Sequence, residues 1–250
     1  MGEWSEDIRL TTDSARSGCP AIAVDSYNNV HIAWNDDREG NYEIYYTTLD
    51  NTGQTLVDDT RLTADSAYSN LPAIAVDSYN NVHIAWCDKR DGNYAIYYTK
   101  LDNAGKTLVD DTRVTADSAG SWWPAIAVDS YNNVHIAWCD KRDGNYAIYY
   151  TKLDNAGKTL VDDTRVTADS AGSWWPAIAV DSYSNVHIAW YDYRDGNYEI
   201  YYTKLDNAGK TLVDDTRLTT DSADSKWPTI AVDSYSNVHI AWYDYRDGNY

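Results

Sequence analysis

The sequence predicts an all-β protein, a five-bladed β-propeller, and three observations lead to this prediction. The chain repeats every 52 residues, each repeat contains four short strand-like segments separated by turn residues, and no segment has a helical period. Residues 72–123 are identical to residues 124–175 at every position. A period near 50 residues with four strands is typical of a propeller blade. The repeat is marked by five prolines: Pro20, Pro72, Pro124, Pro176 and Pro228.

The first half of the repeat predicts two strands, described here for the copy that begins at Pro124. Ala125–Val128 alternates small and large apolar residues, and the polar segment 130–133 (SYNN) that follows is typical of a turn. Val134–Trp138 (VHIAW) is the second strand, and it ends at the Gly-containing loop 140–145. Both strands are short and rich in strand-forming residues.

The second half of the repeat predicts two more strands. Tyr146–Leu153 is β-branched and aromatic, and the turn residues 154–157 (DNAG) end it. Thr159–Thr167 completes the repeat. Four antiparallel strands joined by tight turns form one blade.

One propeller domain is expected over residues 1–250. Residues 1–19 are expected to supply a closing outer strand and the first inter-blade loop. The full repeats are expected at 20–71, 72–123, 124–175 and 176–227, and a partial repeat at 228–250.

The blades are expected to bury one another's faces. In VHIAW, Val134, Ile136 and Trp138 point to one face and His135 and Ala137 to the other. Since an isolated sheet cannot bury both apolar faces, neighbouring blades must cover them. One tryptophan per blade is therefore predicted to lie in the inter-blade core: Trp34, Trp86, Trp138, Trp190 and Trp242.

Composition excludes two classes of partner. Lys and Arg total 20 against 39 Asp and Glu, so the formal net charge of −19 disfavours nucleic acid. No stretch has the roughly 20 apolar residues of a membrane span. The chain contains 11 Trp and 23 Tyr but no Phe, and such amphipathic rings suit half-exposed strands and wet binding surfaces.

Part of each repeat resembles a known family. The segment that begins at Trp190, WYDYRDGNYEIYYTKLDNAGKTL, resembles the sialidase-type propellers that carry the Asp-box, whose pattern is S-x-D-x-G-x-T-W. Leu205–Leu212 matches the Gly and Thr of that pattern, with Leu for Ser, Asn for Asp and Leu for Trp. The same degenerate match occurs at Leu49–Leu56, Leu101–Leu108 and Leu153–Leu160. The resemblance implies a propeller in which this box is a turn between the third and fourth strands, opposite the active site.

A candidate binding face follows from where the repeats differ. In a propeller the inter-blade loop and the loop between strands two and three lie on one face, and differences between the repeats concentrate in these two loops. Flat aromatic rings there would stack on sugar rings, although simple drift of exposed loops, or packing of the inner tryptophans between blades, would produce the same pattern. The candidate ligand-binding residues are Trp122, Trp123, Trp174, Trp175, Trp227, Tyr191, Tyr193, Tyr243 and Tyr245.

The loop after the second strand repeats an Asp-x-Arg motif. Arg90, Arg142 and Arg194 are candidates for contact with an acidic ligand. The alternative is that each guanidinium holds a neighbouring carboxylate and fixes the loop. The carboxylate-rich loops also raise the question of Ca²⁺, but they lack the alternating ligand spacing of an EF-hand, so no cofactor is predicted.

No metal site and no disulfide are predicted. The one histidine per blade cannot share a zinc ion with its neighbour, because packed sheets lie about 10 Å apart and a zinc ligand must reach about 2.1 Å. The same separation excludes a bridge between Cys87 and Cys139.

These observations predict a protein without enzymatic activity. Near-identical blades lack the unlike residues of a sialidase site, and no hydrolase, metalloprotease or phosphate-loop motif occurs. The leading interpretation is a multivalent, lectin-like module for glycans or other polyhydroxyl ligands, in which weak sites on several blades act together. The alternative is a structural or protein-interaction scaffold without a small-molecule site, from a surface protein or made to study repeats.

The ends of the chain leave two questions open. Relative to residues 199–210, the last repeat lacks its third strand, and residues 8–11 are expected to close it as a fourth strand. The incomplete blade is then defective, or another copy donates a strand, or the sequence is a piece of a larger ring. High acidity fits a secreted or cell-surface protein, whereas unpaired thiols fit an intracellular one equally well.

Overall fold

The structure, a computed structural model, describes residues 6–64, 66–116, 119–168 and 171–246. These residues form strands and turns without any helix, in four four-stranded antiparallel sheets and one two-stranded sheet. The predicted all-β propeller with an incomplete last blade is therefore confirmed. None of the described residues forms a helix that could cross a membrane.

Each sheet contains its strands in sequence order. The first strands are β1 (Ser17–Val24), β5 (Ser69–Val76), β9 (Ser121–Val128), β13 (Ser173–Val180) and β17 (Ser225–Val232). The second strands are β2 (Val30–Asp36), β6 (Val82–Asp88), β10 (Val134–Asp140), β14 (Val186–Asp192) and β18 (Val238–Asp244). The third strands are β3 (Glu43–Leu49), β7 (Ala95–Leu101), β11 (Ala147–Leu153) and β15 (Glu199–Leu205). The fourth strands are β4 (Thr55–Arg61), β8 (Thr107–Arg113), β12 (Thr159–Arg165) and β16 (Thr211–Arg217).

The first strand of each sheet is longer than the sequence predicted. It starts before the proline, at Ser121 rather than Ala125 in the third repeat, because a bulge lets the residues on both sides of it pair with the second strand. The residue before each proline takes the left-handed conformation that L-residues rarely adopt, with φ between 49° and 56°. These bulge residues are Cys19, Leu71, Trp123, Trp175 and Trp227.

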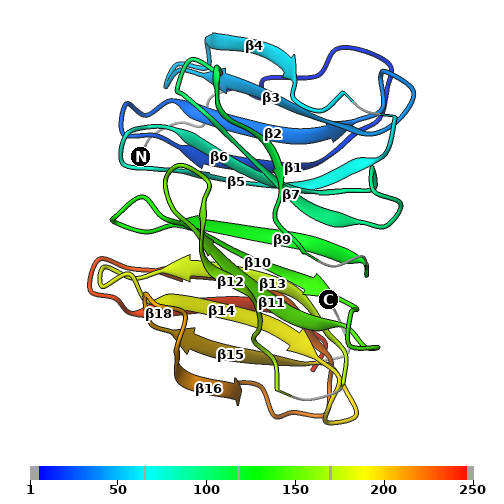
Figure 1. Cartoon of the computed structure of the whole chain (residues 1–250), viewed down its shortest axis with the longest axis vertical. Helices are drawn as coiled ribbons and strands as arrows, with labels where there is room; N and C mark the ends of the chain where they lie inside the picture. The colour runs from blue at the N-terminus through cyan, green and yellow to red at the C-terminus, as the bar shows by residue number, and fades with distance from the viewer. Residues whose placement is uncertain (1–5, 65, 117–118, 169–170, 247–250) are drawn as a thin grey trace.

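The sheets pack face to face, and Figure 1 shows them following one another from β1–β4 to β13–β16. We call the face of a sheet that carries Val134, Ile136 and Trp138 the Trp face, and the opposite one, with His135 and Ala137, the His face. The Trp face of the third sheet packs on the His face of the second, against Cys87 and Tyr98 among others. Because each large face meets a smaller one, the two sheets interdigitate.

The predicted inter-blade tryptophans are confirmed for four blades. Trp34, Trp86, Trp138 and Trp190 are buried. Trp242 is 37% exposed, because the last sheet has only two strands to cover it.

A polar network crosses the junction of the second and third blades and that of the third and fourth. His135 Nδ1 lies 2.7 Å from the Tyr150 hydroxyl, and His135 Nε2 lies 3.2 Å from an Asp129 carboxylate oxygen. Lys152 Nζ lies 3.5 Å from the same carboxylate and donates a 2.9 Å hydrogen bond to the backbone carbonyl of Asn207 in the next blade. His135 is fully buried, and both of its ring nitrogens have hydrogen-bond partners in this network, so its role is structural.

The expected closure by the N-terminal strand is not found. Residues 6–11 form no strand, and β17 and β18 remain a two-stranded sheet among the described residues. Leu10 instead packs on the Trp face of the first sheet, as Leu62 packs on that of the second. Residues 1–5 and 247–250 lie outside the described residues.

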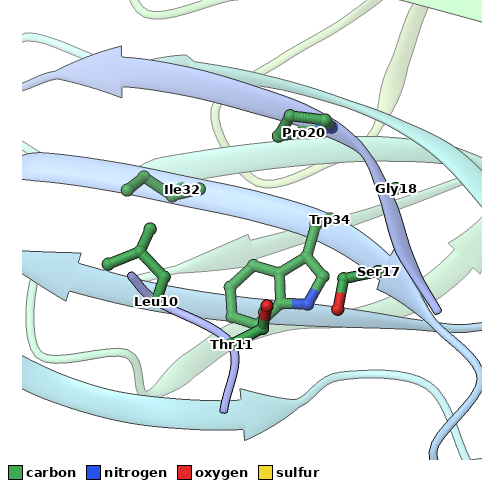
Figure 2. A pocket seen from close by; sticks show the side chains of 7 residues that line it. All are labelled: Leu10, Thr11, Ser17, Gly18, Pro20, Ile32 and Trp34. Atoms are coloured by element: carbon green, nitrogen blue, oxygen red, sulfur yellow. The ribbon is translucent and has the colours of Figure 1, made fainter. Parts of the chain in front are cut away.

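The first sheet consequently keeps an open face. Inner strands pack in the order β1, β5, β9, β13 and β17, and in the described residues β1 and β17 do not pack on each other as these neighbours do. Ile22 is 66% exposed, and beside it Leu10, Pro20, Ile32 and Trp34 line a cavity of about 190 Å³ (Figure 2). The described chain is an arc of four blades and a hairpin.

Candidate functional site

The two variable loops lie together at one end of the sheets, which we call the loop face. The Lys141 amide, just after β10, donates to the Gly120 carbonyl just before β9. The Ser173 amide at the start of β13 donates to the Tyr146 carbonyl, which precedes β11 of the previous blade. These bonds recur in the other repeats and place the inter-blade loop beside the loop between strands two and three, as predicted.

Trp122 and Trp174 lie between tyrosines of adjacent blades. The Trp122 ring centroid is 6.0 Å from that of Tyr94 in the preceding blade and 5.6 Å from that of Tyr146 in its own. Trp174 lies in the same way between Tyr146 and Tyr198. Both indoles are half-buried and pack on the inter-blade cores, so most of their surface serves the junctions.

Two of the tryptophans at the bulges are exposed, Trp175 at 37% and Trp227 at 48%, whereas Trp123 is half-buried like Trp122. Trp123 and Trp175 stack at a centroid distance of 4.5 Å, and they line a cavity of about 300 Å³ with Cys19, Leu71 and the four adjacent prolines. These two tryptophans therefore lie where the first strands of four blades converge, and Trp175 offers more ring surface than its neighbour Trp174.

The predicted tyrosines divide into buried and exposed residues. Tyr191 is buried against Trp174 at 5.9 Å, and this burial raises the pKa of its hydroxyl to about 12. Tyr193 is exposed beside Tyr198, at 4.9 Å between centroids. Tyr243 packs edge-on against Trp227, and Tyr245 is exposed.

Sequence reasoning missed three members of this aromatic surface. Tyr94, Tyr146 and Tyr198 were interpreted as the first residue of the third strand, but each precedes that strand and contacts the tryptophans of the loop face. The signal was present, because each follows Gly-Asn in the variable loop. The loop face thus has a continuous aromatic row from Tyr94 through Trp122, Tyr146 and Trp174 to Tyr198.

Each candidate arginine holds together the strands of its own blade. Arg142 donates to the carboxylate of Asp140 at 2.8 Å and to that of Asp163 on β12 at 2.8 Å, and its guanidinium lies 4.0 Å from the Tyr149 ring centroid. Arg90 and Arg194 make the equivalent pairs. The guanidinium keeps the pKa of the Asp140 carboxyl below its usual value despite burial. This geometry matches the alternative in which the guanidinium holds a neighbouring carboxylate and fixes the loop. Each of the three arginines contacts two carboxylates.

Nothing among the described residues gathers three or more His, Cys, Asp or Glu side chains in a position to hold a metal ion. Cys19, Cys87 and Cys139 are not disulfide-bonded. Burial raises the pKa of the Cys87 and Cys139 thiols well above its usual value, which keeps them protonated and unreactive.

Comparisons with known proteins support the fold. An endo-arabinase from Bacteroides thetaiotaomicron aligns with a TM-score of 0.57 and 15% identity, over 90% of this chain and 88% of that one. A protein of unknown function from Dyadobacter fermentans aligns at 0.69 and 8%, over 93% and 76%. An α-L-arabinofuranosidase of Fusarium graminearum, solved with arabinobiose, aligns at 0.65 and 10%, over 93% and 77%. No family model and no curated protein matches the chain.

The resemblance to sialidase-type Asp-box propellers is not confirmed. The structural neighbours are propeller glycoside hydrolases, a related group, and no family model supports the Asp-box. The turn does lie between the third and fourth strands, where the Asp102 carboxylate accepts hydrogen bonds from the amides of Ala104 and Lys106. A capped turn of this kind stabilises the hairpin whatever its family.

The prediction that excluded enzymatic activity is wrong. The propellers that share its fold include an endo-arabinase and an α-L-arabinofuranosidase. The blades are also less uniform than that prediction assumed. Buried Glu43 and Glu199, the first residues of β3 and β15, stand where the second and third repeats have Ala95 and Ala147.

Proposed function

We propose that this propeller binds glycans through the aromatic row and the bulge tryptophans of its loop face. The observation that carries the proposal is the exposure of Trp175 and Trp227 at left-handed bulges. Backbone strain of this kind costs of order 1–3 kcal/mol per residue and concentrates at ligand sites. Rings fixed in this way lose little conformational entropy when they stack on a sugar.

The rest of the loop face supports the same ligand class. The cavity at Trp123 and Trp175 is lined by cysteine, leucine, proline and tryptophan side chains. Tyr146 lies 6.3 Å from Trp123 between ring centroids, and Lys141 Nζ lies 5.5 Å from the Tyr146 ring, so both supply polar groups near this tryptophan that would bond hydroxyls. The repeated arrangement gives several similar surfaces on one chain, so weak binding to each would add up on a multivalent glycan. The names of the structural neighbours, an endo-arabinase and an α-L-arabinofuranosidase, agree with a carbohydrate ligand.

A glycan array tests this function. The wild-type chain should bind a subset of glycans, and Trp175→Ala and Trp227→Ala should each reduce the signal severalfold. The matched control is Tyr183→Ala, an aromatic residue that is 76% exposed in the turn at the opposite end of the sheet. Equal losses in all three variants, or no binding by the wild type, would contradict the proposal.

Self-association is a second candidate property, and the open face of the first sheet favours it. The exposed Ile22 and Val24 belong to a Trp face, and the last hairpin exposes the complementary His face at His239 and Ala241. Every interior junction pairs these same two faces. The hairpin of a second copy therefore fits the open face of the first.

Sedimentation velocity over a range of protein concentrations tests the association. The wild type should sediment faster as concentration rises, and Ile22→Asp should remain monomeric. Leu56→Asp, an equally exposed apolar position on β4, is the control. A monomeric wild type at every concentration would eliminate this candidate.

A further inference from the structure

The loop face contains a second cavity, of about 390 Å³, at the junction of the first and second blades. Tyr42 and Tyr94 line it, together with Asn35, Asn70 and Trp122. In the next two junctions the corresponding space, between the tyrosines of adjacent blades, holds the indole of Trp122 or Trp174. The cavity exists because the second sheet has Asn70 where the third and fourth sheets have tryptophan.

The polar groups of this cavity also differ from those of the later junctions. Asn35 occupies the position of Cys87 and Cys139, and only 5% of it is exposed. Among the described residues no atom makes a hydrogen bond to Asn35 Oδ1. A buried amide oxygen without a partner costs free energy, so this one is ready to accept a hydrogen bond from a ligand.

The walls define the shape of the ligand. Tyr42 and Tyr94 occupy the positions that Tyr94 and Tyr146 occupy in the next junction, where they hold the Trp122 indole between them. The space that the indole fills there is left here for one flat or chair-shaped ring. Asn70 also lines the cavity and supplies a second side-chain amide. Gly18 is paired with Asn35 across β1 and β2 and brings no side chain over the opening.

We propose that this cavity, which we call the Asn35 cavity, binds a single pyranose ring between Tyr42 and Tyr94, with one sugar hydroxyl donating to Asn35 Oδ1. The inference takes its ligand class from the proposed function but uses different residues from the bulge tryptophans. It assigns the first two repeats a deeper subsite for one sugar ring, beside the shallow stacking surface of the later repeats.

The chain itself supplies the variant that fills the cavity. Tyr68→Gly combined with Asn70→Trp gives the entry to the second sheet the residues that stand at the same two positions before the third and fourth sheets, Gly120 with Trp122 and Gly172 with Trp174. The glycine is required because a Cβ at Gly120 would lie 1.8 Å from the Trp122 ring. Asn35→Cys, the residue of repeats two and three, removes the acceptor at similar volume. Unchanged circular dichroism and denaturant midpoints should show that both variants fold.

Saturation-transfer NMR with methyl pyranosides of glucose, galactose, mannose and N-acetylglucosamine, and with indole, tests the proposal. The measurement is made in a Trp175→Ala, Trp227→Ala background, which removes the stacking surface of the proposed function. In this background at least one methyl pyranoside should bind, bind about fivefold more weakly after Asn35→Cys, and not bind once the cavity is filled. Tyr183→Ala, in the turn at the opposite end of the sheet, should leave this binding unchanged. One hydrogen bond accounts for a change of this size.

Each other result overturns the inference in a distinct way. Pyranoside binding that survives filling, or binding of indole alone, eliminates the sugar subsite. If no pyranoside binds but Trp175→Ala still abolishes the array signal, the proposed function stands and the subsite fails. If neither experiment detects a sugar, both fail together.

Discussion

The second strands of the third and fifth repeats share the sequence VHIAW but differ in their surroundings. In the third, Trp138 lies between two complete sheets and is fully buried. In the fifth, the equivalent Trp242 lies in a two-stranded sheet and is partly exposed. Identical local sequence therefore gives the same strand in both places, whereas burial depends on the neighbouring blade. The interior and terminal repeats are internal controls for each other.

The largest expected difference is between Trp138→Ala and Trp242→Ala. Removing a fully buried indole costs roughly 3–5 kcal/mol of unfolding free energy, because a cavity remains in a packed core. The partly exposed indole should cost about 1 kcal/mol, since water already reaches it. Denaturant unfolding measures both values. Equal losses would mean that the last hairpin is as well covered as an interior blade.

The interior histidines should make the protein sensitive to acid. Burial lowers the pKa of His31, His83, His135 and His187 below 6.5, although their aspartate partners partly offset this. As pH falls below about 6.5, the unfolded chain takes up protons that the folded chain cannot, so folding is destabilised. Each such histidine contributes up to about 1.4 kcal/mol per pH unit in that window. Above about pH 7.5 the dependence should disappear.

Two variants separate interior from terminal histidines in this experiment. His135→Asn should reduce the pH slope of the unfolding free energy by about one proton, whereas His239→Asn, at a side chain that is largely exposed, should leave it unchanged. The Asp129 carboxyl, whose pKa is lowered in the fold, adds a separate loss only below pH 3.8. A slope that His135→Asn does not change would assign the acid sensitivity to other groups.

The sequence predicted what the repeat determines and missed what depends on backbone detail. Period and alternation were sufficient for four strands per blade and for the burial of Trp138. The relative exposure of Trp174 and Trp175 was not predictable, because the left-handed bulge at Trp175 changes which way the two adjacent side chains face. Whether the ring closes was left open by the sequence, since closure depends on the angle between sheets and no residue pattern encodes it directly; the expected closing strand is not found, and the face at Ile22 is open.

Lysine substitutions give the smallest expected contrast. Lys152 Nζ bonds the Asn207 carbonyl of the following blade and faces Asp129, and its side chain is nearly buried. Lys204, its equivalent one repeat later, pairs with Asp181, but the following repeat has no described turn to accept a second bond, and the side chain is 25% exposed. Lys152→Met should therefore cost about 1–2 kcal/mol, because it removes a bond between blades and leaves Asp129 less compensated. Lys204→Met should cost about 0.5 kcal/mol, as expected for an accessible ion pair.

Denaturant unfolding of these two variants decides whether the network acts between blades or only within one. If it acts within a blade, both lysines lose only their aspartate contact and the two variants should be equally stable. A larger loss at Lys152 assigns the difference to Asn207, which accepts from Lys152 Nζ through its backbone carbonyl and its side-chain oxygen. Asn207→Ala removes only the side-chain acceptor and should reproduce part of the loss. Asn207→Ala combined with Lys152→Met should cost no more than Lys152→Met alone, because the lysine substitution already removes both bonds. Additive losses would show that the contact between the Lys152 and Asn207 side chains contributes nothing to stability.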